Sequence, residues 1–552
     1  MEENKPRIGV FICDCGSNIA GHLDCAEVTE YATTLPNVVF AKENLYTCSE
    51  AGIDEIKKGI TENNLTRVVV ASCSPRTHQP LFSSSCAEAG LNPYLFEMAN
   101  IRDQCSWVHM GARDIATAKA KDLVRMSVAK AASLQPQEEI KSSVVKKALV
   151  IGGGIAGLSA AESLCKMGVE VILVEKQKEL GGLLRLINKL ETGESAQENI
   201  ASQIKTVLSL PNITIYTESK IKGIEGYIGN YEVTIQAKDK KHEHKVGCIV
   251  AATGAFPLIP EKGLLGYNSK TVITQMELEQ RLKKGSVDAK NIVMIQCAGS
   301  RNKDKEYCSR ICCMTAVKNA MLIKAENPDT KISILYRDMQ MYGTTKEQML
   351  WDARGEGIDF HIYDESKPPQ VNETTIDFHQ AIVGNTKEIE YDLAVLATPL
   401  TSTQGSMEIA QMLRVPTDKN GFFLEAHAKL RPLDFAADGI FLCGSARFPA
   451  TSEEARTQGM GVASRAGAIL FKDNLTKSAI VAEINPGTCV GCMACVGVCP
   501  YDAISFNADS RICEINEILC KGCGNCASTC PSDSATLKGF KPEQLLSQIG
   551  AA

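Results

Sequence analysis

Eight cysteines near the carboxyl end stand at a spacing that suits redox chemistry. They form two runs of the pattern C-x2-C-x2-C-x3-C-P. Chains with this spacing bind two 4Fe–4S clusters, and the fourth cysteine of each run ligates the cluster of the other run. Zinc is the alternative metal. The pattern predicts two ligand sets, Cys489, Cys492, Cys495 with Cys530 and Cys520, Cys523, Cys526 with Cys499.

A second group of four cysteines lies near the middle of the chain. Its members are Cys297, Cys308, Cys312 and Cys313. Their spacing matches no common zinc pattern. A 4Fe–4S cluster of unusual ligation is one hypothesis for this group, and a redox-active or merely buried set of cysteines is the other.

A third group occupies a predicted small α/β domain over residues 1–134, with strands at Arg7–Ile12 and Arg67–Ala71 and helices near 26–35, 51–61 and 115–132. The carboxyl ends of parallel strands converge on one edge of a sheet, where ligands bind. Four cysteines gathered there would suffice for another 4Fe–4S cluster. The alternative is that they are small buried apolar residues, which is the interpretation given to Cys25 and Cys86. The candidate ligands are Cys13, Cys15, Cys48, Cys73 and Cys105.

A glycine-rich turn near residue 152 predicts a dinucleotide-binding unit. The apolar run Ala148–Ile151 is typical of a buried strand, and the turn GGGIAG, a helix, a second strand and Glu175 follow in order. The glycines allow a tight turn, close approach of a pyrophosphate and close helix packing, and the acid accepts hydrogen bonds from a ribose. A turn without a ligand is the alternative. The predicted contacts are Gly152, Gly154, Ile155, Ala156, Gly157, Glu175 and Lys176.

Three further motifs indicate which dinucleotide binds. Gly181-Gly182 resembles a turn of FAD enzymes of the glutathione-reductase type, and the segment around Thr253 resembles their middle A-T-G motif. Gly444-Ser445 stands where the last motif of that family has Gly-Asp, so Ser445 departs from the pattern. The motifs together predict FAD and a thioredoxin-reductase-like fold. They add Gly181, Gly182, Leu183, Ala252, Thr253, Gly254, Gly444 and Ser445 to the predicted contacts.

The FAD domain is predicted in two parts, residues 146–290 and 390–478, with a second Rossmann-like domain at 291–389 between them. In thioredoxin reductase the second domain binds NADPH through its own glycine turn. Here Cys297 and its neighbours replace that turn, so no pyrophosphate cradle is expected. A helix near 459–468 is expected to direct its N-terminus toward the flavin. The two cysteine runs complete the chain as a ferredoxin domain over residues 484–540.

The composition narrows the class of protein. The 552 residues carry a formal charge of −6 and 44% hydrophobic residues, which gives no reason to expect nucleic acid or an anionic membrane as partner. No signal-peptide pattern and no run of 18 apolar residues is present, so we expect a cytoplasmic protein. Twenty-three cysteines in a reducing compartment indicate metal or redox chemistry rather than disulfides. Cys165, Cys248, Cys443 and Cys513 fall outside the motifs and are interpreted as structural.

The order of these modules and several stretches, among them FICDCGSNI, VVVASCSPRTHQPLF and CSRICCMTAVKNA, resemble the HdrA family of heterodisulfide reductase components over nearly the whole chain. The resemblance implies an FAD-carrying, electron-bifurcating subunit, with clusters at the central and N-terminal cysteines as well as in the ferredoxin domain. It also implies a dimer within a larger complex containing HdrB and HdrC, ferredoxin, and a hydrogenase, formate dehydrogenase or NADH-oxidising input module.

The chain departs from the longer members of that family in one segment. Between Tyr231 and Ile249 it has a short hairpin-like stretch where they carry an inserted ferredoxin unit. The final acceptors are therefore left open. A flavin exchanges electrons singly or in pairs and a cluster takes one, so bifurcation is the first hypothesis. A non-bifurcating relay hub and an NAD(P)H-dependent flavoprotein oxidoreductase are the alternatives.

Overall fold

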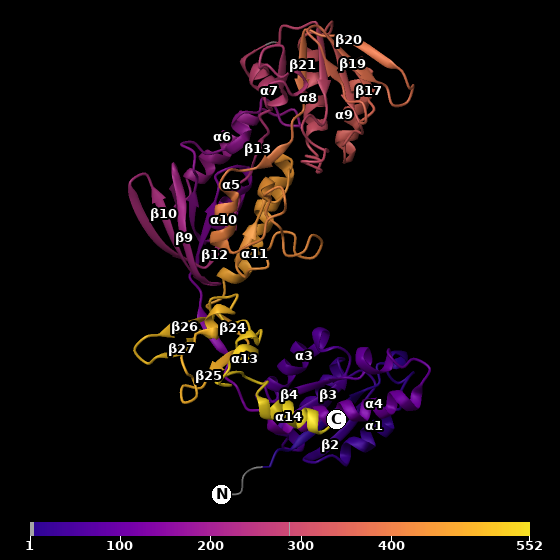
Figure 1. The fold of residues 1–552 in the computed structure, drawn as a ribbon, viewed down its shortest axis with the longest axis vertical. Coiled ribbons are helices and arrows are strands. Elements are labelled where there is room, and N and C mark those ends of the chain that lie inside the picture. Colours follow the sequence, from indigo (N-terminus) through magenta and orange to yellow (C-terminus); the bar gives the residue numbers. More distant parts are fainter. Residues whose placement is uncertain (1–4, 286) are drawn as a thin grey trace. The chain divides into compact units, whose positions relative to one another are not determined.

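The structure is a computed structural model that describes residues 5–285 and 287–552 (Figure 1). The chain divides into two compact units. The first ends at Lys141 and resumes at Thr476, and the second comprises Ser142–Leu475. The first unit thus contains the predicted N-terminal and ferredoxin domains, and the second contains both Rossmann-like domains. Residues 1–4 of the predicted N-terminal domain lie outside the described residues.

The N-terminal domain is built on a four-stranded parallel sheet in the order β2-β1-β3-β4. Both predicted strands and all three predicted helices are present, and β2, β4 and α3 are additional. The half-exposed β2 lacks a clear strand pattern, and α3 contains Pro80. The elements are β1 (Ile8–Cys13), α1 (Cys25–Thr33), β2 (Val38–Asn44), α2 (Glu50–Glu62), β3 (Arg67–Ser72), α3 (Pro75–Glu88), β4 (Phe96–Asn100) and α4 (Arg113–Ser133).

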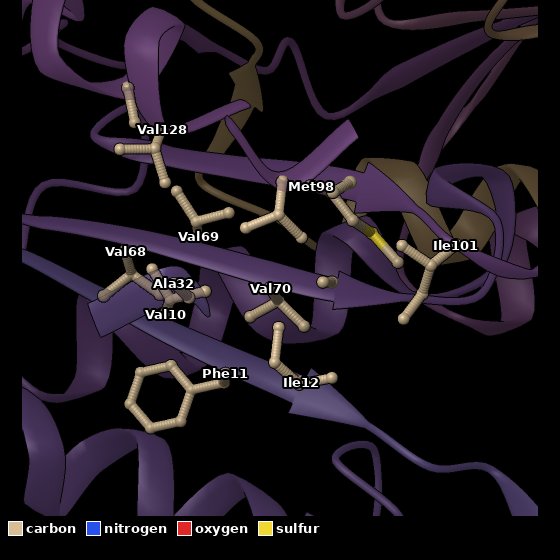
Figure 2. Packing of buried hydrophobic residues seen from close by; sticks show 14 of the residues in the cluster. Val10, Phe11, Ile12, Ala32, Val68, Val69, Val70, Met98, Ile101 and Val128 are labelled. Atoms are coloured by element: carbon tan, nitrogen blue, oxygen red, sulfur yellow. The ribbon is translucent and has the colours of Figure 1, made fainter. Parts of the chain in front are cut away.

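The buried core of this domain fixes the two central strands, β1 and β3, whose carboxyl ends carry cysteines. In Figure 2, Val10 and Ile12 of β1 and Val70 of β3 lie among apolar side chains of the neighbouring elements. All of β1 is buried, and β3 is buried after its first residue. The buried strands carry Cys13 and Cys73 to the same edge of the sheet, since β1 and β3 run parallel in register.

The ferredoxin domain belongs to the same compact unit as the N-terminal domain. Its last helix, α14, lies along α4, where Gln544 donates to the Ser133 carbonyl at 3.1 Å. The Ala479 amide donates to the Tyr94 hydroxyl at 2.7 Å. The elements are β25 (Ala482–Ile484), α12 (Ala494–Gly497), β26 (Ile504–Asn507), β27 (Ile512–Ile515), α13 (Asn525–Thr529), β28 (Ala535–Leu537) and α14 (Pro542–Gly550).

The FAD domain has a five-stranded parallel sheet in the order β23-β12-β6-β7-β8, with a three-stranded antiparallel sheet, β9 to β11, beside it. The predicted short hairpin is confirmed, because β10 and β11 pair up to Ala237 and Lys240. The elements are β6 (Lys147–Ile151), α5 (Ile155–Lys166), β7 (Glu170–Val174), α6 (Ala196–Leu208), β8 (Ile213–Tyr216), β9 (Ser219–Tyr227), β10 (Asn230–Ala237), β11 (Lys240–Val246), β12 (Cys248–Ala251), α10 (Ser406–Leu413), β23 (Ile440–Leu442) and α11 (Ser452–Leu470).

The second Rossmann-like domain is larger than the predicted 291–389. Its parallel sheet has the order β14-β21-β15-β16-β17, so it includes strands that the prediction gave to the FAD domain. These two strands, VIT and LAVL, are too short for their sequence to indicate which sheet they join. The elements are β14 (Val272–Thr274), α7 (Gln275–Lys284), β15 (Asn291–Ile295), α8 (Cys312–Glu326), β16 (Lys331–Tyr336), α9 (Thr344–Gly355), β17 (Asp359–Ile362), β18 (Gln370–Val371), β19 (Thr375–His379), β20 (Thr386–Glu390) and β21 (Leu393–Leu396).

No helix within residues 5–285 and 287–552 combines the length and the apolar character that crossing a membrane requires.

Candidate functional sites

The glycine turn after β6 has the geometry that its sequence predicts. A Cβ atom on Gly152, whose φ is +112°, would collide with the Ala252 carbonyl oxygen. One on Gly157 would collide with the Gly152 carbonyl oxygen, so this glycine permits α5 to pack closely. A Cβ on Gly154 would meet nothing within 4 Å and would project into open space. The structure therefore supplies the tight turn, the close packing and the free approach to the backbone that a pyrophosphate needs.

Glu175 follows β7 and is held by the backbone at the rim of this space. Its carboxylate accepts hydrogen bonds from the amides of Gly153 and Gln177, each at 2.7 Å. The side chain of Lys176 lies over the Phe256 ring, 5.0 Å from its centroid. The two amides fix the acid next to the glycine turn, where the adenosine ribose of a bound dinucleotide belongs.

One pocket joins these residues. All the predicted dinucleotide contacts line it except Gly157 and Gly444. Gly444 instead lets two chain segments approach, because a Cβ there would lie 2.7 Å from the Ala156 Cβ. The Thr253 hydroxyl is buried and, among the described residues, has no hydrogen-bond partner. The glycine cradle, the fixed acid and this orphaned hydroxyl fit a bound FAD. Cys443, interpreted as structural, also lines the pocket.

The helix α11 begins earlier than the predicted residue 459 and directs its first turn at the pocket. Thr451 caps it, accepting from the Glu454 amide at 3.2 Å, and Thr451, Ser452 and Ala455 line the pocket. Two glutamates stand in the first turn and offset part of the positive helix end.

A buried ion pair in the pocket was not predicted from the sequence. Lys318 of α8 is paired with Glu279 of α7, and their side chains are 8% and 2% exposed. Lys318 also donates to the Lys189 carbonyl at 2.7 Å, and Glu279 accepts from the Asn188 amide at 2.9 Å. Both line the pocket. The two residues lie far apart in the sequence and neither belongs to a motif, so only the fold brings them together.

The four central cysteines meet between the end of β15 and the start of α8. Cys297 follows the strand, and Cys312 and Cys313 form the first turn of the helix. Burial raises the pKa of Cys313 to about 12, and the nearby Cys297 and Cys308 thiols contribute to this rise. Burial and the other three central thiols also raise the pKa of Cys312. Cys312 lines the pocket as well. The cysteines therefore occupy the strand-to-helix turn where a Rossmann domain would otherwise hold a pyrophosphate.

Arginines surround this central group. Arg301 makes a bidentate ion pair with Asp338 at 2.6 and 3.1 Å. Burial raises the pKa of Cys297, whereas Arg301 and Arg337 lower it. The Arg310 amide donates to the Cys308 sulfur at 3.3 Å, and its side chain pairs with Glu454 at 2.6 Å. Four converging thiols, an amide donor and nearby positive charge suit an anionic iron–sulfur cluster.

In the N-terminal domain, four of the five candidate cysteines come together. Burial raises the pKa of Cys15 and of Cys73, and the thiols of Cys13 and Cys48 raise both further. The Thr47 amide donates to the Cys13 sulfur at 3.4 Å. Cys105 is fully buried and its thiol donates to the Ala116 carbonyl at 3.0 Å. The geometry thus favours Cys13, Cys15, Cys48 and Cys73 and leaves Cys105 outside the group.

The surroundings of these four cysteines are unusually polar for a buried site. Buried polar atoms of Asp14, Asn44, Thr47 and Ser72 have no hydrogen-bond partner within the described residues. Unpaired buried polar groups are costly, and an inserted cluster with its sulfides would give the donors among them partners. The Arg102 guanidinium lowers the pKa of Cys15 and Cys73, against the effect of burial, and stacks on Trp107 at 4.6 Å.

One of the two predicted ferredoxin ligand sets lines a common cavity. A small cavity is lined by Cys489, Cys492, Cys495 and, from the second run, Cys530. Cysteines of both runs pack on one apolar cluster, which includes Cys489, Cys495, Cys499, Cys520, Cys526 and Cys530. Burial raises the pKa of Cys530, but hydrogen bonds from Ser534 and the Ala535 amide lower it to about 6.

Among the described residues, no three cysteine, histidine or acidic side chains converge closely enough to hold a single metal ion. In a 4Fe–4S cluster each cysteine binds a different iron, so its ligands stand farther apart than those of one zinc ion.

Comparison with known families matches most of the chain. The profile of the pyridine nucleotide-disulphide oxidoreductase family matches residues 146–467, and that of the 4Fe-4S dicluster domain matches residues 471–534. The first match confirms the FAD-binding, thioredoxin-reductase-like core, and the second confirms a domain with two 4Fe–4S clusters. Thioredoxin reductase from T. acidophilum, 15% identical, aligns with a TM-score of 0.42 over 59% of this chain and 99% of its own.

Curated relatives are similar over nearly the full length. One of them, an iron-sulfur component (HdrA) of the CoB--CoM heterodisulfide reductase of Methanopyrus kandleri, is 37% identical over 601 aligned positions, which cover 91% of this chain and 92% of the relative. The corresponding component of the H(2):CoB-CoM heterodisulfide,ferredoxin reductase of Methanothermobacter thermautotrophicus is 36% identical, covering 92% and 91%. Since 91% of 552 residues is about 502, about 100 positions of the first alignment have no counterpart in this chain.

Proposed function

Because the chain belongs to the HdrA family of heterodisulfide reductase components, we propose that it splits electron pairs at FAD between two acceptor branches. The coarser function is established by the same relatives and family profiles: the chain is an oxidoreductase subunit that uses a flavin and iron–sulfur clusters. The proposal adds the direction of electron flow, the number of clusters and the residues that hold them.

The pocket residues have defined tasks in this proposal. The glycine turn at Gly154 would hold the pyrophosphate of FAD, and Glu175 would accept hydrogen bonds from its ribose. FAD exchanges electrons singly or in pairs, and each cluster takes one. The observation that carries the proposal is the position of Cys312, which belongs to the central cysteine group and also lines the FAD pocket. A cluster bound by this group would therefore lie next to a flavin bound in the pocket.

The ion pair of Lys318 and Glu279 supplies a proton position in the pocket. Flavin reduction by two electrons takes up protons, and the buried Lys318 Nζ is a donor held by Glu279 and the Lys189 carbonyl. Removing one partner of a buried pair leaves an uncompensated charge and is strongly destabilising, by about 3–5 kcal/mol. We assign Lys318 to donating a hydrogen bond into the pocket and Glu279, together with the Lys189 carbonyl, to orienting its ammonium group.

Electrons are expected to enter through a protein partner. Cys297 and the first turn of α8 occupy the place of the second pyrophosphate cradle, so hydride from NADH or NADPH on this chain is disfavoured. The relative from Methanothermobacter thermautotrophicus is named for hydrogen, ferredoxin and the CoB-CoM heterodisulfide. We propose cytoplasmic partners of the same kinds: HdrB-like and HdrC-like proteins, an input module such as a hydrogenase, formate dehydrogenase or NADH-oxidising module, and ferredoxin, in a complex where this chain forms a dimer.

Bifurcation has a simple energetic condition. Raising one electron by roughly 100 mV costs about 2.3 kcal/mol, which the other electron must release. Cluster potentials span a range wide enough for both branches, from about −700 to +450 mV. The cysteines that we assign to four clusters provide enough one-electron carriers for two branches.

A second candidate function is a relay that moves electrons in one direction only. The observation that favours it is the short β10–β11 hairpin, together with the roughly 100 aligned positions that this chain lacks. If the missing positions carry electrons in the relatives, this chain has fewer routes by which electrons can leave the flavin than they do.

The test compares ferredoxin reduction by the complete complex with and without a disulfide acceptor. Bifurcation predicts that a donor of higher potential reduces ferredoxin only when the disulfide is also present, because the uphill electron needs a downhill partner. Disulfide reduction that never yields reduced ferredoxin would identify the relay. Equal ferredoxin reduction without the disulfide would contradict bifurcation. The Gly154→Val variant is the control: it should lose flavin, keep the ferredoxin clusters and show neither activity.

A further inference from the structure

The loop that carries the central cysteines, between β15 and α8, has an unusual backbone. Three of its residues other than glycine, Cys297, Arg301 and Arg310, have φ values of +61°, +54° and +63°. Residues with a Cβ atom rarely adopt this left-handed conformation, and such strain persists only where surrounding contacts hold it. Contacts made by the two arginine side chains supply that support.

The two arginines are held by different domains. Arg301 pairs with Asp338 at 2.6 and 3.1 Å, and Asp338 lies just after β16 of the same domain. Arg310 pairs with Glu454 at 2.6 Å, and Glu454 stands in the first turn of α11 in the FAD domain. Arg310 also donates to the Pro449 carbonyl at 3.3 Å. One anchor of the loop is thus within its own domain, and the other crosses to the FAD domain.

The two carboxylate oxygens of Glu454 have separate partners. Oε2 accepts from the Thr451 amide at 3.0 Å, which completes the capping box of α11, and from the Tyr342 hydroxyl at 3.3 Å. Oε1 accepts from the Arg310 guanidinium at 2.6 Å. Thr451 lines the FAD pocket. One side chain therefore connects the wall of that pocket with the loop of the central cysteines.

Arg310 extends this connection to the cysteines themselves. Its amide donates to the Cys308 sulfur at 3.3 Å, and its guanidinium lies over the Tyr342 ring, 4.9 Å from the centroid. The side chains of Arg310 and Glu454 are 34% and 30% exposed, so solvent screens part of their attraction. A charge-assisted hydrogen bond is nevertheless short and directional. The pair therefore suits a positioning role more than a large contribution to stability.

The neighbouring Glu453 provides a matched comparison. It stands in the same first turn of α11, so its charge acts on the helix end in the same way. Its partner is Lys346 of α9, at 3.1 Å, which is not a residue of the cysteine loop. The two glutamates thus share a charge and a helix end but hold different segments of the chain.

We propose that Glu454 is a positioning residue for electron transfer. One of its oxygens caps α11 at the FAD pocket, the other holds Arg310, and the loop of the central cysteines thereby keeps a fixed place beside the flavin. Because electron transfer slows steeply with distance, a fixed loop keeps the two carriers within reach of each other. The role in electron transfer rests on the proposed function, whereas the connection between helix and loop does not.

Variants of the full-length, anaerobically purified protein test the proposal by amide hydrogen exchange and by a redox titration of the central cluster. Glu454→Gln keeps the cap, because glutamine also serves in capping boxes, but its amide nitrogen cannot accept from Arg310. Glu453→Gln makes the same change of charge one residue earlier and is the control. Arg310→Ala removes the other partner, and a double variant combines it with Glu454→Gln. Iron and flavin content are measured for each protein.

In Glu454→Gln, we expect the amides of residues 297–313 to exchange about three- to tenfold faster than in the wild type, as for the loss of one partly exposed hydrogen bond to a charged group. The first turn of α11 should exchange as in the wild type. At the wild-type midpoint, the reduced-to-oxidised ratio of the central cluster should fall about threefold, because the Arg310 amide no longer keeps its bond to the Cys308 sulfur. The double variant should match Arg310→Ala, and Glu453→Gln should match the wild type.

Wild-type exchange of the loop in Glu454→Gln would overturn the proposal. An equal rise in Glu453→Gln would also overturn it, since the cause would then be the lost charge at the helix end. Faster exchange with an unchanged potential of the central cluster would leave Glu454 a structural residue only. A wild-type protein without central iron would contradict the proposed function and the role in electron transfer, while the exchange rates would still decide whether Glu454 holds the loop.

Discussion

The ferredoxin domain and the N-terminal domain gather cysteines in opposite ways. In the ferredoxin domain the ligands stand at fixed short intervals, and backbone amides close to them in sequence, such as those of Ala503 and Gly522, donate to their sulfurs. In the N-terminal domain the four grouped cysteines come from Cys13 at the end of β1, Cys73 after β3 and two loops. A buried parallel sheet, and not a local motif, brings them together.

This difference determines how easily each cysteine site is recognised in the sequence and how strongly it depends on the stability of its domain. A local pattern is visible in the sequence and survives many changes elsewhere, since neighbouring residues set the geometry. A site assembled by a sheet depends on the register of β1 and β3 and on their buried side chains. Its ligands are visible in the sequence only as unpaired cysteines after apolar runs. We therefore expect the N-terminal site to be the more sensitive of the two to changes in the fold.

The largest predicted effect is on total iron. We predict four 4Fe–4S clusters: two in the ferredoxin domain, one at the central cysteines and one at the N-terminal cysteines. Together they contain about sixteen iron atoms per chain. Iron and acid-labile sulfide, measured after anaerobic purification, check this number. About eight irons would mean that only the local motif binds clusters and that the cysteines assembled by the fold are structural.

The next prediction separates the five N-terminal candidates. Cys48→Ala should remove about four irons, because Cys48 belongs to the group that includes Cys13, Cys15 and Cys73. Cys105→Ala is the matched control, a buried cysteine whose thiol bonds to a carbonyl. It should retain all the iron. Equal losses of iron in the two variants would place Cys105 among the ligands. Full retention of iron in both would show that this domain binds no cluster.

The sequence predicted the local features of both regions and missed those that arise from tertiary structure. Spacing predicted two crossed ferredoxin ligand sets, one of which lines a common cavity, and apolar runs predicted β1, β3 and the strands of the FAD turn. The sequence did not decide which four of the five N-terminal candidate cysteines come together. That depends on the order of the strands in the sheet, which includes the unpredicted β2 and β4. The pair of Lys318 and Glu279 was missed for the same reason. Their contact depends on how α7 and α8 pack, and neither residue belongs to a periodic pattern.

A smaller effect is expected from weakening the sheet itself. Phe11 of β1 is fully buried and is one of the core residues labelled in Figure 2. Phe11→Ala should lower the free energy of unfolding of this domain by about 3–5 kcal/mol. Iron at the N-terminal site should then be released to a chelator at a lower temperature than iron of the ferredoxin domain. The exposed Leu45→Ala variant in the same domain is the control and should behave as wild type. Release of iron from both domains at the same temperature would show that the two domains unfold together.

The smallest effect concerns the charge beside the N-terminal group. Arg102 is held by Asp103 at 2.9 Å and by stacking on Trp107, and its guanidinium acts on the thiols of Cys15 and Cys73. A positive charge stabilises the reduced, more negative cluster, so Arg102→Gln should lower the potential of this cluster while iron content stays unchanged. Because the arginine is partly exposed, solvent screens the interaction, and we expect a shift on the order of 30–60 mV, where 59 mV is tenfold for one electron. Arg102→Lys should recover part of the shift, since lysine keeps the positive charge but not the planar guanidinium that stacks on Trp107.

The reduction potentials of the ferredoxin clusters serve as the internal reference. A shift in those potentials, or none at the N-terminal cluster, would mean that Arg102 positions the loop and does not tune the cluster.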